Sequence, residues 1–495
     1  MKKYKNSIFY VGVIGVFSVL IYWIAIKGKE LEESNVGSNI SNDSAWTQFM
    51  DLIAENLHHP LALLLAQIVT IVIVARVFGW FFRKIGQPSV IGEIIAGIVL
   101  GPSLFGWLFP ETSAMIFPVS SIGNLQNFSQ VGLMLFMYVI GMELDLNVLK
   151  NKARNAVIIS HASIILPFTL GMGLAYFLYK QFAPEGIEFL SFALFMGIAM
   201  SITAFPVLAR IVQERGIHKT QLGTVVLTCA AADDITAWCI LATVIAIVNA
   251  GSFESSLYVI TLAVGYVFIM LKLVRPFLKR IGDLHSSKGA LNKGVVAIFL
   301  LTLIISAYLT EIIGIHALFG AFMAGAIMPE NAKFRHILIE KVEDIAVILF
   351  LPLFFVYTGL KTDMRFLFQD LSLFKVTGWI ILVAVIGKFV GSAVASKYVG
   401  QNWKDSLIIG ALMNTRGLME LVVLNIGLEL GVISQEVFTM MVIMALVTTF
   451  MTGPSLDIIN KIFRAKDNII PDEISTPGKM YNSRKPSTRF SFISA

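Results

Sequence analysis

The chain has 495 residues, of which 56% are hydrophobic and 14% charged, and its net charge is +6. Soluble globular proteins carry about 25% charged residues, so the composition excludes an ordinary soluble domain. The basic residues cluster in a few loops between long apolar runs, which argues against a nucleic-acid partner. A run of about 20 apolar residues crosses a bilayer as a helix, because backbone polar groups cannot stay unpaired in lipid. The sequence therefore predicts an all-α integral membrane protein whose partner is the lipid bilayer.

The first apolar run covers residues 1–26 and follows a basic start. No small-x-small cleavage site occurs near its end, so we favour an uncleaved span over a cleaved signal peptide. A polar segment, 27–59, comes next, and we assign 1–59 to an extra N-terminal span with an external loop. Thirteen further apolar runs give about 14 helices in all; they cover 61–81, 88–109, 128–145, 155–179, 188–209, 220–249, 256–274, 294–312, 315–328, 343–360, 375–399, 405–430 and 436–455.

Basic residues concentrate in alternate loops. They include Arg83–Lys84, Arg210, Arg215 and Lys404, whereas the opposite side receives few. Loops rich in Lys and Arg remain in the cytoplasm. We therefore expect an even number of spans in the cell membrane, with both termini cytoplasmic. Residues 456–495 form a polar cytoplasmic tail with no Gly-x-Gly-x-x-Gly fingerprint.

Cys229 and Cys239 are the only cysteines. Both lie inside apolar runs, so we interpret them as packing residues rather than a disulfide or a metal pair. The histidines show no metal-ligand spacing, and we expect no cofactor.

Two parts of the chain resemble each other in the same order. GEIIAG, starting at Gly92, resembles GAFMAG, starting at Gly320, and a Leu-Phe pair followed by Gly141 resembles one followed by Gly359. In the predicted topology the paired helices run in opposite directions, as in the inverted repeats of transporters. Close helix packing explains single glycines but not an ordered, inverted pair. We predict a transporter domain over 60–455, with inverted repeats over 60–250 and 294–455.

The repeat register pairs residues 201–206 (SITAFP) with 414–419 (NTRGLM). Pro206 and Gly417 interrupt helices in these segments, amid small polar residues such as Ser201 and Thr203. Paired interruptions mark the binding site of a transporter, because broken helices free carbonyls and expose dipole ends.

Asp233 and Asp234 lie about 13 residues into the 220–249 run, near the middle of the membrane. A charge there costs about 2.5–3.5 kcal/mol on insertion scales. One reading is a structural salt bridge beside a cap-like hydrogen bond. We favour a binding site, since carboxylate oxygens suit hard cations and two adjacent carboxylates raise each other's proton affinity. Such a pair holds either protons or a monovalent cation.

Three other charges lie within apolar runs. Lys388 needs a carboxylate partner, which we expect to be Asp233 or Asp234; a pair that titrates and a purely structural pair are both open. Arg416 and Glu420 are four residues apart on one helix, and we expect them to neutralise each other and the broken-helix dipoles.

The segments around Ser201–Arg210, Ala230–Trp238, Gly387–Phe389 and Asn414–Leu421 together resemble the cation:proton antiporter-2 branch of the monovalent cation/proton antiporters. This branch includes Kef-like systems, bacterial Na⁺/H⁺ antiporters and plant cation/proton exchangers, and the resemblance covers about 60–455. It implies an antiporter fold with two broken, crossing helices, a homodimer, and exchange of Na⁺ or K⁺ for protons.

The resemblance also implies roles for individual residues. Asp234 is then the main ion-binding carboxylate, Asp233 its companion, Lys388 the core lysine, and Thr203 with Ser201 the neighbours on the first broken helix. An Asp-Asp pair with the lysine implies electrogenic exchange. The glutathione gating of Kef systems is not expected, because the tail has no nucleotide-binding fingerprint.

Two other classes of protein fit the sequence less well. A potassium efflux channel is the alternative closest in function, but it would need a Thr-Val-Gly-Tyr-Gly-type carbonyl filter, which the sequence lacks. An intramembrane zinc enzyme would need His-Glu-x-x-His, which is also absent. We therefore expect a secondary transporter and not an enzyme.

Overall fold

The structure is a computed structural model of the full chain. It describes residues 2–29, 44–57, 59–143, 146–217, 220–250, 253–285, 293–329 and 332–467. The chain divides into two compact units, Met1–Ala62 and Leu63–Ala495. Most of the predicted external loop and of the polar tail lies outside the described residues.

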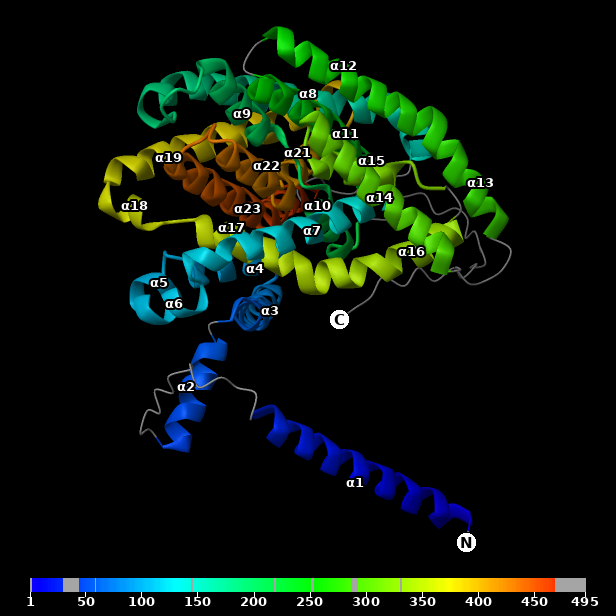
Figure 1. The fold of residues 1–495 in the computed structure, drawn as a ribbon. Helices are drawn as coiled ribbons and strands as arrows, with labels where there is room; N and C mark the ends of the chain where they lie inside the picture. The colour runs from blue at the N-terminus through cyan, green and yellow to red at the C-terminus, as the bar shows by residue number, and fades with distance from the viewer. Residues whose placement is uncertain are drawn as a thin grey trace. The chain divides into compact units, whose positions relative to one another are not determined.

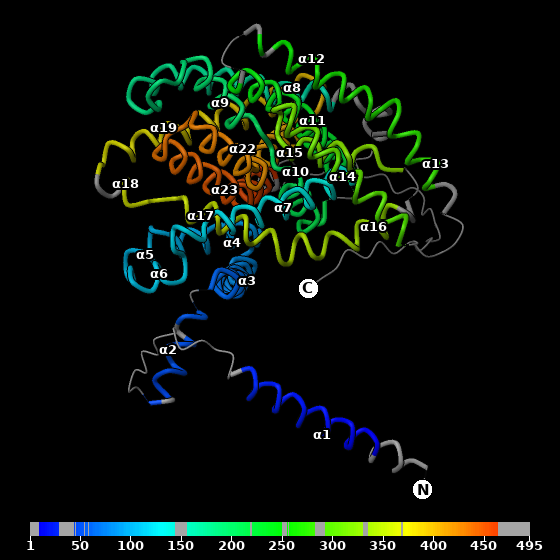
Figure 2. The backbone as a smooth tube through the Cα atoms, in the orientation of Figure 1, coloured from blue at the N-terminus to red at the C-terminus, as the bar shows by residue number. Residues whose placement is uncertain are grey.

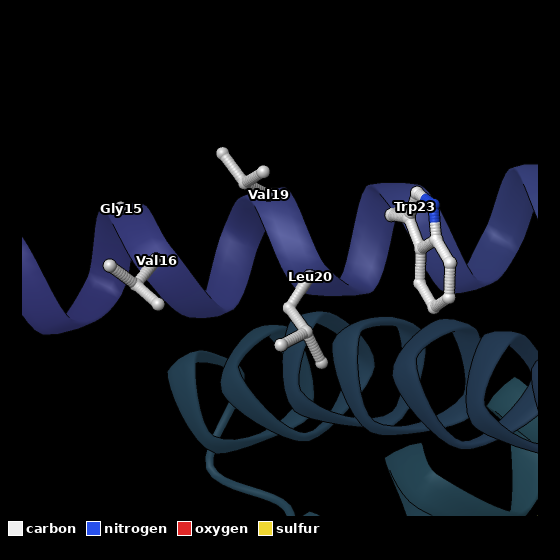
Figure 3. Close-up of a pocket in the computed structure, with 5 residues that line it drawn as sticks. All are labelled: Gly15, Val16, Val19, Leu20 and Trp23. Carbon is white, nitrogen blue, oxygen red and sulfur yellow. The ribbon is translucent and has the colours of Figure 1, made fainter.

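The first unit contains α1 (Lys2–Lys29) and α2 (Ala45–Leu57). Residues 9–28 of α1 form a span of mean hydropathy 2.3 that buries none of its surface within the protein. Gly15, Val16, Val19, Leu20 and Trp23 share one stretch of this helix (Figure 3). An apolar helix exposed all round is what a lipid-embedded span requires.

The second unit is helical, with no strand among its described residues. Its helices in chain order (Figure 1) are α3 (Pro60–Lys84), α4 (Ser89–Leu100), α5 (Phe105–Leu108), α6 (Pro110–Ile116), α7 (Val119–Glu143), α8 (Leu146–Phe182), α9 (Phe189–Ser201), α10 (Phe205–Glu214), α11 (Gln221–Ala250), α12 (Phe253–Ile269), α13 (Arg275–His285), α14 (Lys293–Ile313), α15 (Ala317–Ala326), α16 (Ala332–Ile345), α17 (Leu351–Lys361), α18 (Arg365–Gln369), α19 (Leu371–Val385), α20 (Gly391–Tyr398), α21 (Trp403–Met413), α22 (Leu418–Glu429) and α23 (Gln435–Asp467). Among the described residues, three π-helical segments join neighbouring helices: η1 (Met270–Val274), η3 (Ala346–Phe350) and η4 (Ile386–Val390).

Twelve described helical segments are long and apolar enough to cross a membrane. The pair α21–α22, bent by 40°, provides a thirteenth span. The predicted run at 315–328 forms only α15, a helix of 10 residues. Such a helix is about 15 Å long, half the thickness of the hydrocarbon core. The all-α membrane fold is therefore confirmed, whereas the count of 14 spans is not.

Glycines bring the two predicted repeats into contact. A Cβ added at Gly359 of α17 would lie 2.5 Å from the Cα of Gly97 in α4, and one at Gly325 of α15 would lie 2.9 Å from the Cα of Gly141 in α7. The first helix of each copy thus packs on the second helix of the other. This exchanged contact is what a twofold-related, inverted pair requires, and only glycine allows backbones to approach so closely.

A second set of helices surrounds the two interrupted ones. α8 and α11 both contact α9, α11 and α20 both contact α21, and α23 packs on α19, α21 and α22. Figure 1 shows α10, α21 and α22 close together in the middle of this unit, and Figure 2 traces the same region as a tube. The candidate functional site lies at the two helix breaks, between α9 and α10 and between α21 and α22.

Candidate functional site

The two helix breaks are joined by hydrogen bonds. The backbone N–H of Ala204 donates to Thr415 O at 3.1 Å, and the Thr203 hydroxyl donates to Met413 O at 3.1 Å. Pro206 stands in the first turn of α10, where a missing N–H costs nothing. Gly417 precedes α22 with φ of 154°, a backbone conformation that favours glycine. Each break therefore follows from its own sequence.

Asp233 lies on α11 and is fully buried, but it is well partnered. Its Oδ2 lies 2.8 Å from the ammonium of Lys388. Its Oδ1 accepts hydrogen bonds from the hydroxyls of Ser163 at 2.8 Å and Ser160 at 3.4 Å, both on α8. A buried carboxylate is tolerated when paired and hydrogen-bonded in this way.

Lys388 lies in the π-helical segment η4 and is also fully buried. Its ammonium donates to Asp233, to Ser163 O at 3.0 Å and to Ser201 O. All three of its N–H groups are thus used. The neighbouring Gly387 lets η4 approach α8, since a Cβ there would lie 2.8 Å from Pro167 Cα.

Asp234 has the same burial but different surroundings. It is 0% exposed, and neither of its carboxylate oxygens has a hydrogen-bond partner of ordinary geometry. The backbone N–H of Phe205, at the start of α10, contributes an attractive interaction to it. An unpartnered carboxylate is costly in a buried site, so this group needs a proton or a cation.

Arg416 and Glu420 form a second buried pair, with Nη1 and Oε1 3.3 Å apart. Arg416 also donates to Ala199 O at 3.1 Å and Met200 O at 2.7 Å, the last carbonyls of α9. The negative end of α9 thus faces two cations, Arg416 and Lys388. Compensation of the broken-helix dipoles by Arg416 and Glu420 stays a prediction, for which these contacts provide the geometry.

The buried charges of the site do not cancel. Asp233, Asp234 and Glu420 are acidic, whereas Lys388 and Arg416 are basic, and all five are 0% exposed. With every group ionised the site carries three negative and two positive charges, a net charge of −1. One proton or one monovalent cation would neutralise it. Carboxylate oxygens and freed backbone carbonyls are hard ligands of the kind that alkali cations accept.

The structure places the predicted site residues around the two helix breaks, and the roles predicted for them in ion binding stay predictions. The Thr203 hydroxyl joins the two breaks, and the Ser201 hydroxyl donates to Ile198 O at 2.9 Å. Sequence reasoning missed Ser160, Ser163 and Thr449; the last accepts from Arg416 N at 3.1 Å. The only signal for the α8 pair is a Ser-x-x-Ser spacing at the start of a span.

These features define a membrane transporter of the inverted-repeat type, with two broken helices crossing beside buried carboxylates. The model of the family "Sodium/hydrogen exchanger, transmembrane" matches residues 69–461, and the chain belongs to this family. Because its relatives are antiporters, it is a transporter and not an enzyme. Among solved structures, the sodium proton antiporter MjNhaP1 from Methanocaldococcus jannaschii matches with a TM-score of 0.59 at 14% identity, covering 82% of this chain and 98% of that one.

Curated relatives of this chain are also named as antiporters. The Na(+)/H(+) antiporter NhaS4 of Synechocystis is 43% identical over 80% of this chain and 97% of its own length. Cation/H(+) antiporter 17 of Arabidopsis thaliana is 40% identical over 80% of this chain, and the K(+)/H(+) antiporter 1 of Saccharomyces cerevisiae is 35% identical over 81%. The chain spans about half the length of these plant and yeast relatives, 48% and 46%. Cation/proton antiport is thus supported, with sodium and potassium both represented among the relatives.

Proposed function

We propose that this chain exchanges Na⁺ or K⁺ for protons by alternating access, with Asp234 as the group that binds either ion. The observation that carries this proposal is a buried excess of one carboxylate, three carboxylates against two cations, which gives a net charge of −1 when all five groups are ionised. Within this set, neither oxygen of Asp234 has a hydrogen-bond partner of ordinary geometry. A site of this charge alternates between two neutral states, one with a proton and one with a cation. Competition for one carboxylate is enough to couple the two fluxes.

The other charged groups have supporting roles. Lys388 neutralises Asp233 and keeps the second carboxylate out of competition while the pair is intact. Arg416 holds the carbonyl end of α9, and the Thr203 hydroxyl joins the breaks, so the cation meets a preorganised set of oxygens. While the Lys388–Asp233 pair is intact, exchange is one proton for one cation and moves no net charge. Displacement of Lys388 would add a second titrating carboxylate, and the electrogenic exchange that the resemblance implies requires this displacement. We further propose a homodimer in the cell membrane.

Proteoliposomes loaded with a pH-sensitive dye test this proposal. Adding NaCl or KCl outside should change the internal pH in the wild type, and the more effective salt identifies the transported cation. Asp234→Asn should abolish the response, because a neutral amide cannot exchange a proton for a cation. Asp51→Asn, which changes an exposed carboxylate of α2, is the matched control and should respond normally. An Asp234→Asn protein that exchanges at the wild-type rate would refute the site.

A further inference from the structure

A groove lies between the segment α12–η1–α13 and α14, formed by residues that take no part in the ion site. Its volume is about 580 Å³, and its lining is mostly apolar, with the hydroxyl groups of Thr261, Tyr266, Thr302 and Ser306 among it. The lining includes Gly265, Ile269, Leu273, Phe277, Ile305 and Leu309. Its walls belong to the spans Leu257–Gly282 and Lys293–Ile313, so it opens toward the bilayer.

Gly265 creates much of this space. A Cβ built on it would meet no atom within 4 Å. The floor is closed by Tyr266 and Ser306, whose hydroxyls lie 2.5 Å apart, while Ser306 also donates to Gly320 O at 2.6 Å. The polar groups of the floor thus satisfy one another, and the walls offer mostly apolar contact to an occupant.

The groove ends beside basic side chains. Between Met270 and His285 the sequence has four basic residues and one acidic residue. Lys272, Lys279 and Arg280 are exposed. Arg280 follows Phe277 by three residues, so it stands on the same helix face one turn beyond the groove. An apolar channel that ends in exposed cations matches an amphiphile with an anionic head.

We propose that this groove binds one anionic phospholipid. An acyl chain lies along Gly265, Leu273 and Phe277, and the headgroup phosphate contacts Lys279 and Arg280. Basic pockets between membrane helices commonly take anionic lipids on the cytoplasmic side, which is where the charge distribution places α13.

The length of the groove suits an acyl chain. The lining extends from Thr261 to Phe277, about 24 Å along the helix at 1.5 Å per residue. An extended acyl chain of a membrane phospholipid has a similar length, so one chain can follow the whole lining.

Native mass spectrometry of the full chain tests the proposal. The protein in detergent is given equal amounts of phosphatidylglycerol and phosphatidylcholine with identical acyl chains. Wild type should retain one phosphatidylglycerol per chain in preference to phosphatidylcholine. The double variant Lys279→Gln/Arg280→Gln should lose this preference, at about fivefold per charge removed. Gly265→Leu should lose retention of both lipids, because its side chain fills the groove.

Matched controls are Lys341→Gln, an exposed lysine of α16, and Gly173→Leu, whose new Cβ also meets no atom within 4 Å. Both should retain lipid as wild type does. Continued salt-driven pH change in proteoliposomes establishes that each variant is folded. Equal retention of the two lipids by wild type, or an unchanged preference in the double variant, would overturn the proposal. So would a Gly265→Leu protein that keeps its lipid but becomes monomeric, which would assign the groove to a second copy of the chain.

Discussion

The ammonium of Lys388 lies 2.8 Å from Asp233 and donates no hydrogen bond to the adjacent Asp234. The two neighbouring carboxylates are thereby made different. Asp233 has a cation and two serine hydroxyls, whereas Asp234 has no hydrogen-bond partner of ordinary geometry. One carboxylate is thus held by the protein, and the other is the one that we propose binds the transported ion.

The first prediction concerns this buried pair. Lys388→Met should lower the free energy of unfolding by about 3–5 kcal/mol, because it leaves Asp233 charged and unpaired. The double variant Asp233→Asn/Lys388→Met should recover part of that loss, since no isolated charge then remains. Thermal unfolding in detergent measures both. Lys375→Met, an exposed lysine of α19, is the control and should melt near wild type. If Asp233→Asn lowers the free energy of unfolding by the same amount with and without Lys388→Met, the pair is not coupled.

A second prediction separates Arg416 from Glu420. Arg416→Met should cost about 3–5 kcal/mol, because it strips a buried carboxylate and two helix-end carbonyls of their partner. Glu420→Gln should cost about 1 kcal/mol, since Arg416 keeps both carbonyls and an amide oxygen can still accept. The comparison uses the same unfolding assay. If both variants lose the same free energy of unfolding, Arg416 stabilises the protein only through Glu420 and not through the carbonyls at the end of α9.

The third prediction uses the contact between the repeats. Gly359→Ala and Gly325→Ala should each destabilise the protein by about 1–3 kcal/mol, because the added methyl group meets backbone atoms that cannot move aside. Gly378→Ala places a methyl group where no atom lies within 4 Å and should leave the melting temperature unchanged. A large loss at one contact and none at the other would contradict the symmetric packing.

The sequence predicted the buried charged residues best, because an ionised group within a membrane span has a high free-energy cost. Ionisable residues in membrane spans are rare and are usually paired or functional. Five residues stand out for this reason: Asp233, Asp234, Lys388, Arg416 and Glu420. The assignment of Lys388 to Asp233 could not be predicted, because adjacent residues on a helix differ by about 100° in direction and the choice depends on how α8 and η4 pack.

Other features could not be predicted from the sequence, for different reasons. Serine is common and inexpensive in membrane helices, so Ser160 and Ser163 could not be told from packing residues. The run at 315–328 is apolar enough to predict a span, but hydropathy does not reveal where a helix stops. The inverted repeat was visible because its contacts require glycine at fixed positions.

A fourth prediction tests orientation. The charge distribution places the loop between α8 and α9 outside and the end of α10 in the cytoplasm. Exposed positions there are Glu185 and Gln213. In a background lacking Cys229 and Cys239, Glu185→Cys should react with an impermeant thiol reagent in intact cells, whereas Gln213→Cys should react only after the membrane is opened. The reverse pattern would invert the topology. The positions Ser38 and Ser487, predicted outside and inside, lie beyond the described residues.

The central claim is that a cation and a proton compete for Asp234, and proton release on cation binding tests it most directly. Purified protein in weakly buffered detergent is titrated with NaCl, then KCl, while the pH of the solution is followed. Wild type should release about one proton for each cation bound, because a site with a net charge of −1 is neutralised by either. Cation affinity should fall as the pH is lowered. Asp234→Asn should release none, whereas Asp51→Asn should behave as wild type. Proton release from Asp234→Asn equal to that of wild type would contradict the account.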